Sequence, residues 1–171
     1  MKTVLYIATT LNGYIATTKD DAPWSMEVFE NYYTYIKQTG NIIVGRRTYE
    51  IMKDVGEFAE LGNPFTVVVT SQNIFKNTEK TRFVPSIKQA LREVEDMGFT
   101  TAVIGGGSQL NTSALKAGVI DEIEIDIEPF IFSNGIPLFE SSDIQLNLRL
   151  IGTTKINANT LHVQYQVIKL H

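Results

Sequence analysis

The chain has 171 residues, of which 43% are hydrophobic and 20% are charged, and its formal net charge is −4. We expect a single domain spanning residues 1–171, because a chain of this length can bury roughly two-thirds of the surface that it exposes when unfolded. No apolar stretch approaches the roughly 20 residues that cross a bilayer, and the acidic balance disfavours binding to nucleic acid. With no cysteine and only two histidines, the sequence also offers little material for a metal site.

The N-terminal segment 1–7 is apolar, and we expect it to be the first strand. It reaches the polar pair Thr9 and Thr10 too soon for the core of a secretory signal, so the expected location is the cytoplasm. Two longer stretches, 11–23 and 55–64, are expected to be loops that border a binding site.

Three short runs at 41–44, 65–69 and 101–104 are apolar without alternation and rich in β-branched residues. This pattern is typical of parallel strands that are covered on both faces. Helical periodicity precedes the first run, at 26–36, and the third run, at 87–97. The repeated order of strand and helix predicts a three-layer α/β/α fold around a mostly parallel sheet.

The two expected helices differ in how clearly they are marked. The first keeps an apolar face formed by Met26, Phe29, Tyr33 and Ile36, which we expect to be buried. The second begins at Ser86, which starts a capping-box pattern, and it ends at a glycine stop.

The C-terminal third of the sequence has a different pattern. Residues 122–128 alternate strictly between acidic and apolar side chains, which we interpret as a half-exposed strand with a solvated acidic face. Leucines alternate at 146–150, and a further strand-like run covers 161–167 after the turn-forming segment 157–159. These runs predict an antiparallel hairpin that joins the edge of the sheet. His162 is expected on the polar face of the last strand, and we do not expect it to be catalytic.

The most informative motif is the strand-like run at 101–104, which is followed by Gly105, Gly106 and Gly107 and then by a helical segment. Glycines let a phosphate approach the backbone, and a helix N-terminus offers unpaired N–H donors with a partial positive charge. A tight strand-to-helix turn would also use glycine, but three in succession exceed what a turn requires. The spacing is neither that of the common dinucleotide fingerprint nor that of a P-loop, so a different cofactor fold is expected.

Polar residues follow the other two buried strands. Arg46, Arg47 and Thr48 come after the first, where Thr48 could cap a helix and the arginines present permanently charged forks. Thr70 and Ser71 follow the second. A solvated arginine pair at a helix start is the alternative interpretation. Because ligands of open α/β sheets bind beyond the carboxyl ends of strands, we expect these residues to contact the 2′-phosphate that distinguishes NADPH from NADH.

An ordered set of motifs resembles the dihydrofolate-reductase-like superfamily, and specifically the reductase domain at the C-terminus of the riboflavin-biosynthesis deaminase-reductase. Residues 10–16, Thr-Leu-Asn-Gly-Tyr-Ile-Ala, resemble its Ser-Leu-Asp-Gly-x-Ile-Ala opening, and residues 45–50 resemble its Gly-Arg-x-Thr cofactor segment. Residues 105–110, 117–123 and 129–139 are similar to its third block. The resemblance covers nearly the whole chain.

This resemblance implies an eight-stranded, mostly parallel sheet flanked by helices, with NADPH lying across the strand ends. It also implies a homodimer built through the C-terminal strands. The residues implied to flank the nicotinamide are Ala8, Thr9 and Ile15. The residues implied to hold the phosphates are Gly45, Arg46, Arg47, Thr48, Thr70, Ser71, Gly105, Gly106, Gly107, Ser108, Gln109 and Leu110.

The substrate side departs from the family pattern. Folate reductases carry a carboxylate early in the first helix, and the matching position here is Ser25. Glu30 lies at the margin of that helix's apolar face and Asn12 replaces the family's aspartate, so these two are the candidate catalytic residues. Trp24 and Phe29 are the candidate substrate-binding aromatics, because their rings can stack on a flat heterocycle.

These observations favour an NADPH-dependent reductase of a small heterocycle, resembling the 5-amino-6-(5-phosphoribosylamino)uracil reductase of riboflavin biosynthesis. A pterin reductase of the dihydrofolate reductase type and a non-catalytic NADPH-binding sensor are the alternatives. The zinc deaminase half of the bifunctional enzyme is not expected, because its chemistry needs a His/Cys site and the chain has no cysteine.

Overall fold

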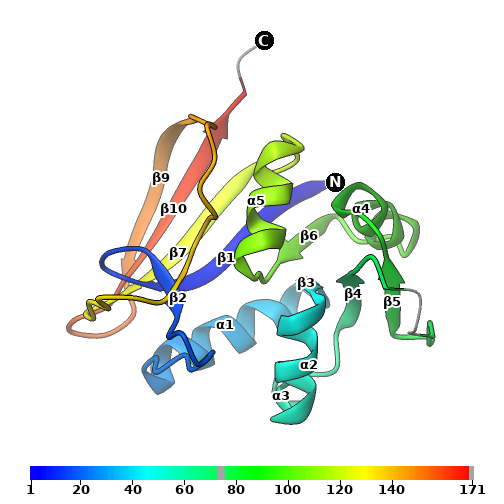
Figure 1. Ribbon diagram of the computed structural model, residues 1–171, viewed down its shortest axis with the longest axis horizontal. Coiled ribbons are helices and arrows are strands. Elements are labelled where there is room, and N and C mark those ends of the chain that lie inside the picture. The colour runs from blue at the N-terminus through cyan, green and yellow to red at the C-terminus, as the bar shows by residue number, and fades with distance from the viewer. Residues whose placement is uncertain (73–75, 170–171) are drawn as a thin grey trace.

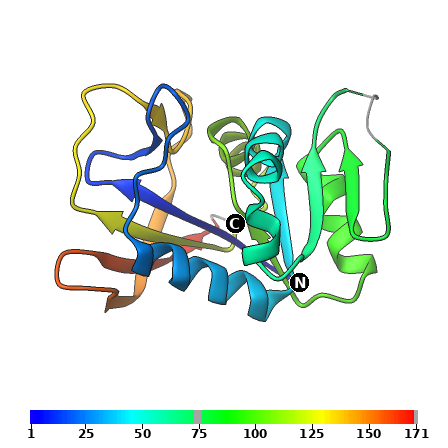
Figure 2. The same cartoon turned by 90° about the horizontal axis from the view of Figure 1, so that it is seen from below.

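Helices cover both faces of a central eight-stranded sheet in the computed structural model, which describes residues 1–72 and 76–169 (Figures 1 and 2). A second, small sheet pairs β2 (Tyr14–Ala16) with β8 (Ile136–Pro137). From one edge of the central sheet to the other, the strands are β5 (Thr81–Val84), β4 (Phe65–Val69), β3 (Asn41–Gly45), β6 (Thr101–Ile104), β1 (Lys2–Thr10), β7 (Glu122–Glu128), β10 (Leu161–Ile168) and β9 (Asn147–Lys155).

The strand directions agree with the sequence pattern. Neighbouring strands from β5 to β7 pair in parallel, whereas β10 runs antiparallel to both β7 and β9. The turn between β9 and β10 is closed by a hydrogen bond from the Ile156 N–H to the Thr160 carbonyl, at 3.0 Å. The prediction of a mostly parallel eight-stranded sheet with a C-terminal antiparallel hairpin is therefore confirmed.

The helices of the described residues form the two outer layers of the fold (Figure 1). The predicted helix start at Ser86 is confirmed, because the Ser86 hydroxyl accepts the Gln89 N–H at 3.3 Å. None of the helices within 1–72 and 76–169 has the length and apolar character needed to cross a membrane. On one face of the sheet lie α1 (Met26–Thr39), α2 (Arg46–Asp54) and the short α3 (Glu57–Glu60), and on the other lie α4 (Ile87–Asp96) and α5 (Ser108–Lys116).

Each face of the sheet carries its own apolar core, because successive side chains of a strand point to opposite faces. Leu5 and Ile43 belong to the core beneath α4 and α5. Their neighbours Val4 and Ile42 belong to the core beneath α1 and α2. All four side chains are fully buried, and burial of each contributes about 1.5–3 kcal/mol.

Helix α1 buries only part of the predicted stripe, in which Ile36 is fully buried and Phe29 and Tyr33 are half-buried. Val28 is buried, whereas Met26, which was expected in the core, is 68% exposed. The reason lies in the sheet below, where Tyr6 of β1 fills this face. The Tyr6 ring meets Tyr32 and Tyr35 of α1 edge-on, with ring centroids 5.2 and 4.9 Å apart. The helix is therefore rotated so that its tyrosines, rather than Met26, contact the strand.

The acidic side of β7 is buried, so the expectation of a solvated acidic face is wrong. Glu124, Asp126 and Glu128 are only 3%, 0% and 2% exposed, because α1 and the residue before it cover this face. Hydrogen bonds compensate the lost hydration. The Tyr6 hydroxyl donates to Asp126 at 2.8 Å, and the Ser25 hydroxyl and N–H donate to Glu128 at 2.6 and 2.9 Å. The strand is thus covered on both faces, one apolar and one polar.

Candidate functional site

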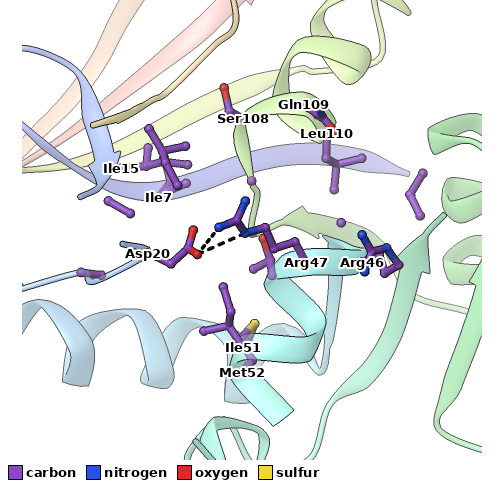
Figure 3. Close-up of a pocket in the computed structure, with 18 of the residues that line it drawn as sticks. Ile7, Ile15, Asp20, Arg46, Arg47, Ile51, Met52, Ser108, Gln109 and Leu110 are labelled. Atoms are coloured by element: carbon purple, nitrogen blue, oxygen red, sulfur yellow. Dashed lines mark hydrogen bonds and ion pairs between the residues drawn. The ribbon is translucent and has the colours of Figure 1, made fainter. Parts of the chain in front are cut away.

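A cavity of about 820 Å³ lies at the carboxyl ends of the central parallel strands (Figure 3). This volume is typical of small-molecule sites, and this edge of a parallel sheet is where α/β proteins bind ligands. Thr9 and Gly106 are buried and lie outside the wall. The predicted cofactor residues that the fold brings together in the wall are Ala8, Ile15, Gly45, Arg46, Arg47, Thr48, Thr70, Ser71, Gly105, Gly107, Ser108, Gln109 and Leu110.

The N-termini of α2 and α5 both border this cavity. Neither helix has a side chain that caps its first N–H groups, and neither has an acidic residue in its first turn. Thr48, expected to cap α2, does not do so, and the residue at the cap position is Gly45. The loops before the two helices are joined by a hydrogen bond from the Gly45 N–H to the Gly106 carbonyl, at 2.8 Å. Two sets of unsatisfied N–H donors with partial positive charge therefore face the same space.

The hydroxyl of Ser108, the first residue of α5, is buried and has no hydrogen-bond partner among the described residues. The residue is 7% exposed and forms part of the cavity wall. A buried polar group without a partner costs about 1–3 kcal/mol. A ligand that accepts a hydrogen bond from this hydroxyl would remove that free-energy cost.

The glycine triplet serves packing at one position and access at another. A Cβ at Gly105 would lie 2.6 Å from the Tyr32 hydroxyl, so packing alone requires glycine there. At Gly107 a Cβ would meet only the Thr48 Oγ1, at 3.2 Å, between the starts of α2 and α5. The bare backbone at Gly107 thus keeps the space between the two helix N-termini open.

Each arginine at the start of α2 is paired with a carboxylate. The Arg46 Nη1 donates to both carboxylate oxygens of Glu50, at 2.7 and 3.0 Å. Arg47 donates to Asp20 through its Nε, at 3.1 Å, and through its Nη2 (Figure 3). Asp20 belongs to the stretch 11–23, and no local pattern marks it as a partner of Arg47. Exposed ion pairs of this kind contribute at most about 1 kcal/mol, so a phosphate can replace the carboxylates.

Another part of the wall is apolar and aromatic. It includes Trp24 and Phe29, the two predicted substrate-binding residues, together with Ala8 and Ile15. The Trp24 ring stacks against Phe132, with centroids 6.2 Å apart and an interplanar angle of 13°. These side chains give this region the character of a slot for a flat ring.

Asn12 and Glu30, the candidate catalytic residues, lie outside the cavity wall. The Asn12 Oδ1 accepts the Thr10 hydroxyl at 2.9 Å and the Phe132 N–H at 3.3 Å, and its Nδ2 donates to the Phe132 carbonyl at 2.8 Å. Asn12 therefore fastens the turn after β1 to a distant loop. Glu30 is exposed because α1 turns Val28 toward the sheet instead.

A buried polar cluster that the sequence analysis did not anticipate lies beside the cavity. This Asp126 cluster consists of Tyr6, Glu124, Asp126 and His162, and both Tyr6 and Asp126 belong to the cavity wall. The Asp126 Oδ2 accepts the Tyr6 hydroxyl, and the Asp126 Oδ1 lies 2.6 Å from the His162 Nδ1. The His162 Nε2 lies 3.2 Å from a Glu124 oxygen. Asn31 of α1 donates to the Tyr6 oxygen at 2.7 Å.

The environment of the cluster fixes its charges. Burial alone would lower the pKa of His162, but hydrogen bonds to Asp126 and Glu124 and their charges raise this pKa to about 9. Burial alone would raise the pKa of Glu124, but hydrogen bonds, the first from His162, hold it below its usual value. Burial and the adjacent Asp126 raise the pKa of Tyr6, so its hydroxyl stays a neutral donor. His162 does lie on a polar face, but that face is buried, and two carboxylates surround its imidazolium, which leaves one net negative charge.

Comparison with known proteins identifies the family. The model of the RibD C-terminal domain matches residues 2–162. The chain belongs to the RibD C-terminal domain family. In sequence, this RibD C-terminal domain is 29% identical over 177 residues to the uncharacterised protein YwjB of Bacillus subtilis, covering 99% of the chain and 96% of the relative. It is also 29% identical over 167 residues to dihydrofolate reductase type 1 of Escherichia coli, covering 98% of each.

Solved structures share the fold of this RibD C-terminal domain. A pyrimidine reductase-like protein of Corynebacterium diphtheriae matches 98% of the chain and 92% of its own length, with a TM-score of 0.75 and 15% identity. RibD of Acinetobacter baumannii matches 98% of the chain and 58% of its own length, with a TM-score of 0.78 and 14% identity. Dihydrofolate reductase of Enterococcus faecalis, complexed with NADP(H), matches 98% and 97%, with a TM-score of 0.68 and 18% identity. The predicted dihydrofolate-reductase-like fold is therefore confirmed.

Proposed function

We propose that this protein is an NADPH-dependent reductase of a small heterocyclic or imine-bearing substrate. Membership of the RibD C-terminal domain family supports an oxidoreductase, because similar proteins are named as reductases. The observation that carries the proposal is the pair of uncapped, acid-free N-termini of α2 and α5, which border one cavity with Arg46, Arg47 and the unpartnered Ser108 hydroxyl. A cofactor with several phosphates needs such donors in one place.

The donors of the cavity fit the phosphates of NADPH. The first N–H groups of α5 and the Ser108 hydroxyl would hold the pyrophosphate. Arg46 and Arg47, together with Thr70 and Ser71 at the end of β4, would hold the phosphates of the adenosine half. The 2′-phosphate is the group that would displace a carboxylate from an arginine.

The apolar slot fits the reacting half of the complex. Ala8 and Ile15 would flank the nicotinamide, and Trp24 and Phe29 would stack on a flat substrate. When bound, NADPH supplies the hydride. The protein itself contributes position and the exclusion of water, because hydride transfer needs donor and acceptor close together.

The reducible group is a C=N or C=O bond of a small ring compound. The aminopyrimidine of riboflavin biosynthesis, 5-amino-6-(5-phosphoribosylamino)uracil, is one substrate candidate, supported by the family match. A dihydropterin is the second, favoured by the 29% identity to a dihydrofolate reductase along 98% of both chains.

The test is binding and oxidation of NADPH in the presence of a panel that contains the aminopyrimidine phosphate, dihydrofolate, imines and quinones. We expect Arg46→Ala to weaken NADPH binding roughly 10- to 100-fold and NADH binding much less, because only NADPH has a 2′-phosphate for the arginine. Lys53→Ala, which removes an exposed cation from the same helix, is the control and should change neither affinity. Equal losses for the two cofactors would remove the 2′-phosphate assignment. NADPH binding without turnover of any compound would favour the non-catalytic sensor.

We also propose a homodimer formed through β9 and β10. β9 is the edge of the sheet, where unpaired backbone groups are available to a second copy. Apolar side chains gather on and beside these two strands, and each is between 39% and 54% exposed. They are Leu146, Leu148, Leu150, Ile151, Leu161 and Ile168.

A further inference from the structure

Charge is distributed unevenly around the cavity. Among the described residues of the wall, the arginine and lysine side chains are those of Arg46 and Arg47, and both lie at the start of α2. The wall next to Ala8, where the nicotinamide is proposed to lie, instead carries Asp126. Ala8 of β1 and Asp126 of β7 are partners in the parallel register, so their side chains lie next to each other on one face of the sheet. The place where a substrate must meet the nicotinamide is therefore beside a carboxylate.

The elements packed against Asp126 offset its charge only in part. β1 contributes the neutral Tyr6 hydroxyl, and α1 contributes the Asn31 amide behind it. β7 adds Glu124 as a second carboxylate, and β10 contributes His162, the cation that pairs with both carboxylates within the described part of the chain. The Asp126 cluster therefore carries one net negative charge in a buried part of the cavity wall.

Asp126 also has hydrogen-bond acceptor sites left for a cationic ligand. A carboxylate has about four acceptor sites, and Tyr6 and His162 occupy one on each oxygen. Charges act more strongly across a poorly hydrated wall than in bulk water. A positively charged ring beside Ala8 is stabilised by this wall, whereas a phosphate ester there meets like charge and, among the described residues of the wall near Ala8, no unpaired cation.

We propose that Asp126, positioned by Tyr6 and His162, sets the substrate specificity of the reductase, so that the site takes a flat nitrogen heterocycle carrying a positive charge, such as an iminium ion, rather than a phosphate ester. This inference rests on the proposed function. In the reaction, the hydride and its electron pair from NADPH form a C–H bond at the iminium carbon, and the C=N π pair moves to nitrogen. The products are a neutral amine and NADP⁺, so no further proton is required.

The test compares three flat probes of nearly the same shape, namely N-methylisoquinolinium, neutral isoquinoline and an isoquinoline sulfonate. Binding is followed by the fluorescence of Trp24, the single tryptophan of the chain, which belongs to the cavity wall. We expect the cation to bind at least about tenfold tighter than the neutral probe, and the sulfonate to bind most weakly at this wall. The titrations are run without cofactor and repeated with saturating adenosine 2′,5′-bisphosphate, which covers the arginines at the start of α2 without placing a cationic nicotinamide beside Asp126. Equal affinities for the three probes, or a preference for the sulfonate with the bisphosphate present, would overturn the inference.

Two variants that change the charge of the Asp126 cluster in opposite directions make the test specific. Asp126→Asn keeps the shape of the side chain but removes its charge, and it should abolish the preference for the cation. His162→Gln removes the compensating positive charge, and it should enlarge the preference. Glu122→Gln, a change on the same strand but outside the cavity wall, is the control and should leave the preference unchanged. If Asp126→Asn does not fold, an unchanged preference in His162→Gln overturns the inference on its own.

Kinetics with N-methyl-3,4-dihydroisoquinolinium give a second readout. Asp126→Asn should raise KM about tenfold without lowering kcat, because the wall stabilises a charge that the reaction removes. A lower kcat with an unchanged KM would contradict this role. A protein that does not bind NADPH but prefers the cation would refute the proposed reductase, while NADPH turnover without a cation preference would refute only the assignment of Asp126.

Discussion

Raising the pH through 9 should destabilise the protein by neutralising His162. In the folded protein its imidazole lies between the carboxylates of Asp126 and Glu124, and its pKa is about 9 against an ordinary value of 6.5. A raised pKa means that the folded state binds the proton more tightly than the unfolded state does. The resulting stabilisation is fully present below pH 6.5, declines above it and is lost as the pH passes 9.

The magnitude follows from the interval between the two pKa values. Each pH unit corresponds to about 1.36 kcal/mol, so the interval from 6.5 to about 9 gives roughly 3 kcal/mol of stability that depends on the His162 proton. The side chain is only 12% exposed, so solvent screens this contribution little. For a domain of this size, a loss of roughly 3 kcal/mol lowers Tm by roughly 6–12 °C.

The assay is denaturant unfolding of the wild type and of His162→Gln across this pH range. The difference in unfolding free energy between the two proteins should be largest near and below pH 6.5 and should shrink as the pH passes 9. An NMR titration of the histidine ring, carried out in His171→Ala so that one histidine remains, should give a midpoint near 9. Parallel stability curves, or a ring that titrates near its ordinary value, would refute the reasoning.

Three further substitutions separate binding from folding. Ser108→Ala should weaken NADPH binding about tenfold without lowering Tm, because it removes a hydroxyl that has no partner within residues 1–72 and 76–169. Ser86→Ala deletes the cap of α4, so it should lower the unfolding free energy by about 1 kcal/mol and leave NADPH affinity unchanged. Calorimetry that shows the reverse pattern for these two variants would contradict both assignments. Gly107→Ala should reduce NADPH affinity about tenfold with an unchanged circular dichroism spectrum, because its methyl group fills the space beside Thr48, and undiminished binding would show that the phosphates lie elsewhere. The double change of Leu148 and Leu150 to lysine should give a monomer in light scattering, whereas a dimer that survives it does not use this edge.

Local patterns predicted the frame of the site well. The strands at 41–44, 65–69 and 101–104 are continuous apolar runs. In a chain that alternates strands and helices, such runs indicate parallel strands that are covered on both faces. Once the strands are parallel, their carboxyl ends must share an edge, so the glycine triplet and the arginines had to meet there. The convergence of these predicted site residues on one cavity could therefore be foreseen from sequence.

The Asp126 cluster could not be foreseen in the same way. A strand that alternates acid and isoleucine has the same period whether its acidic face meets water or a helix. The difference lies in the partners, and Tyr6 is 120 positions away from Asp126 in the sequence while His162 is 36 away. One signal was available, because the predicted C-terminal strand carries His162, and this strand, β10, is the antiparallel neighbour of β7 and pairs His162 with Asp126 in register.

The departure of the first helix from the family pattern and the buried acids of β7 are two parts of one arrangement. Folate reductases carry a carboxylate early in this helix, and the matching residue here, Ser25, is a donor that satisfies Glu128 instead. A carboxylate at position 25 would face Glu128 at hydrogen-bond distance, and the repulsion between them would be costly in a buried site. The negative charge beside the cavity is thus supplied by the sheet, through Asp126, and the helix supplies the donors that make buried acids tolerable. Substrate recognition in this protein is therefore expected to follow the register of β1 and β7 rather than the face of α1.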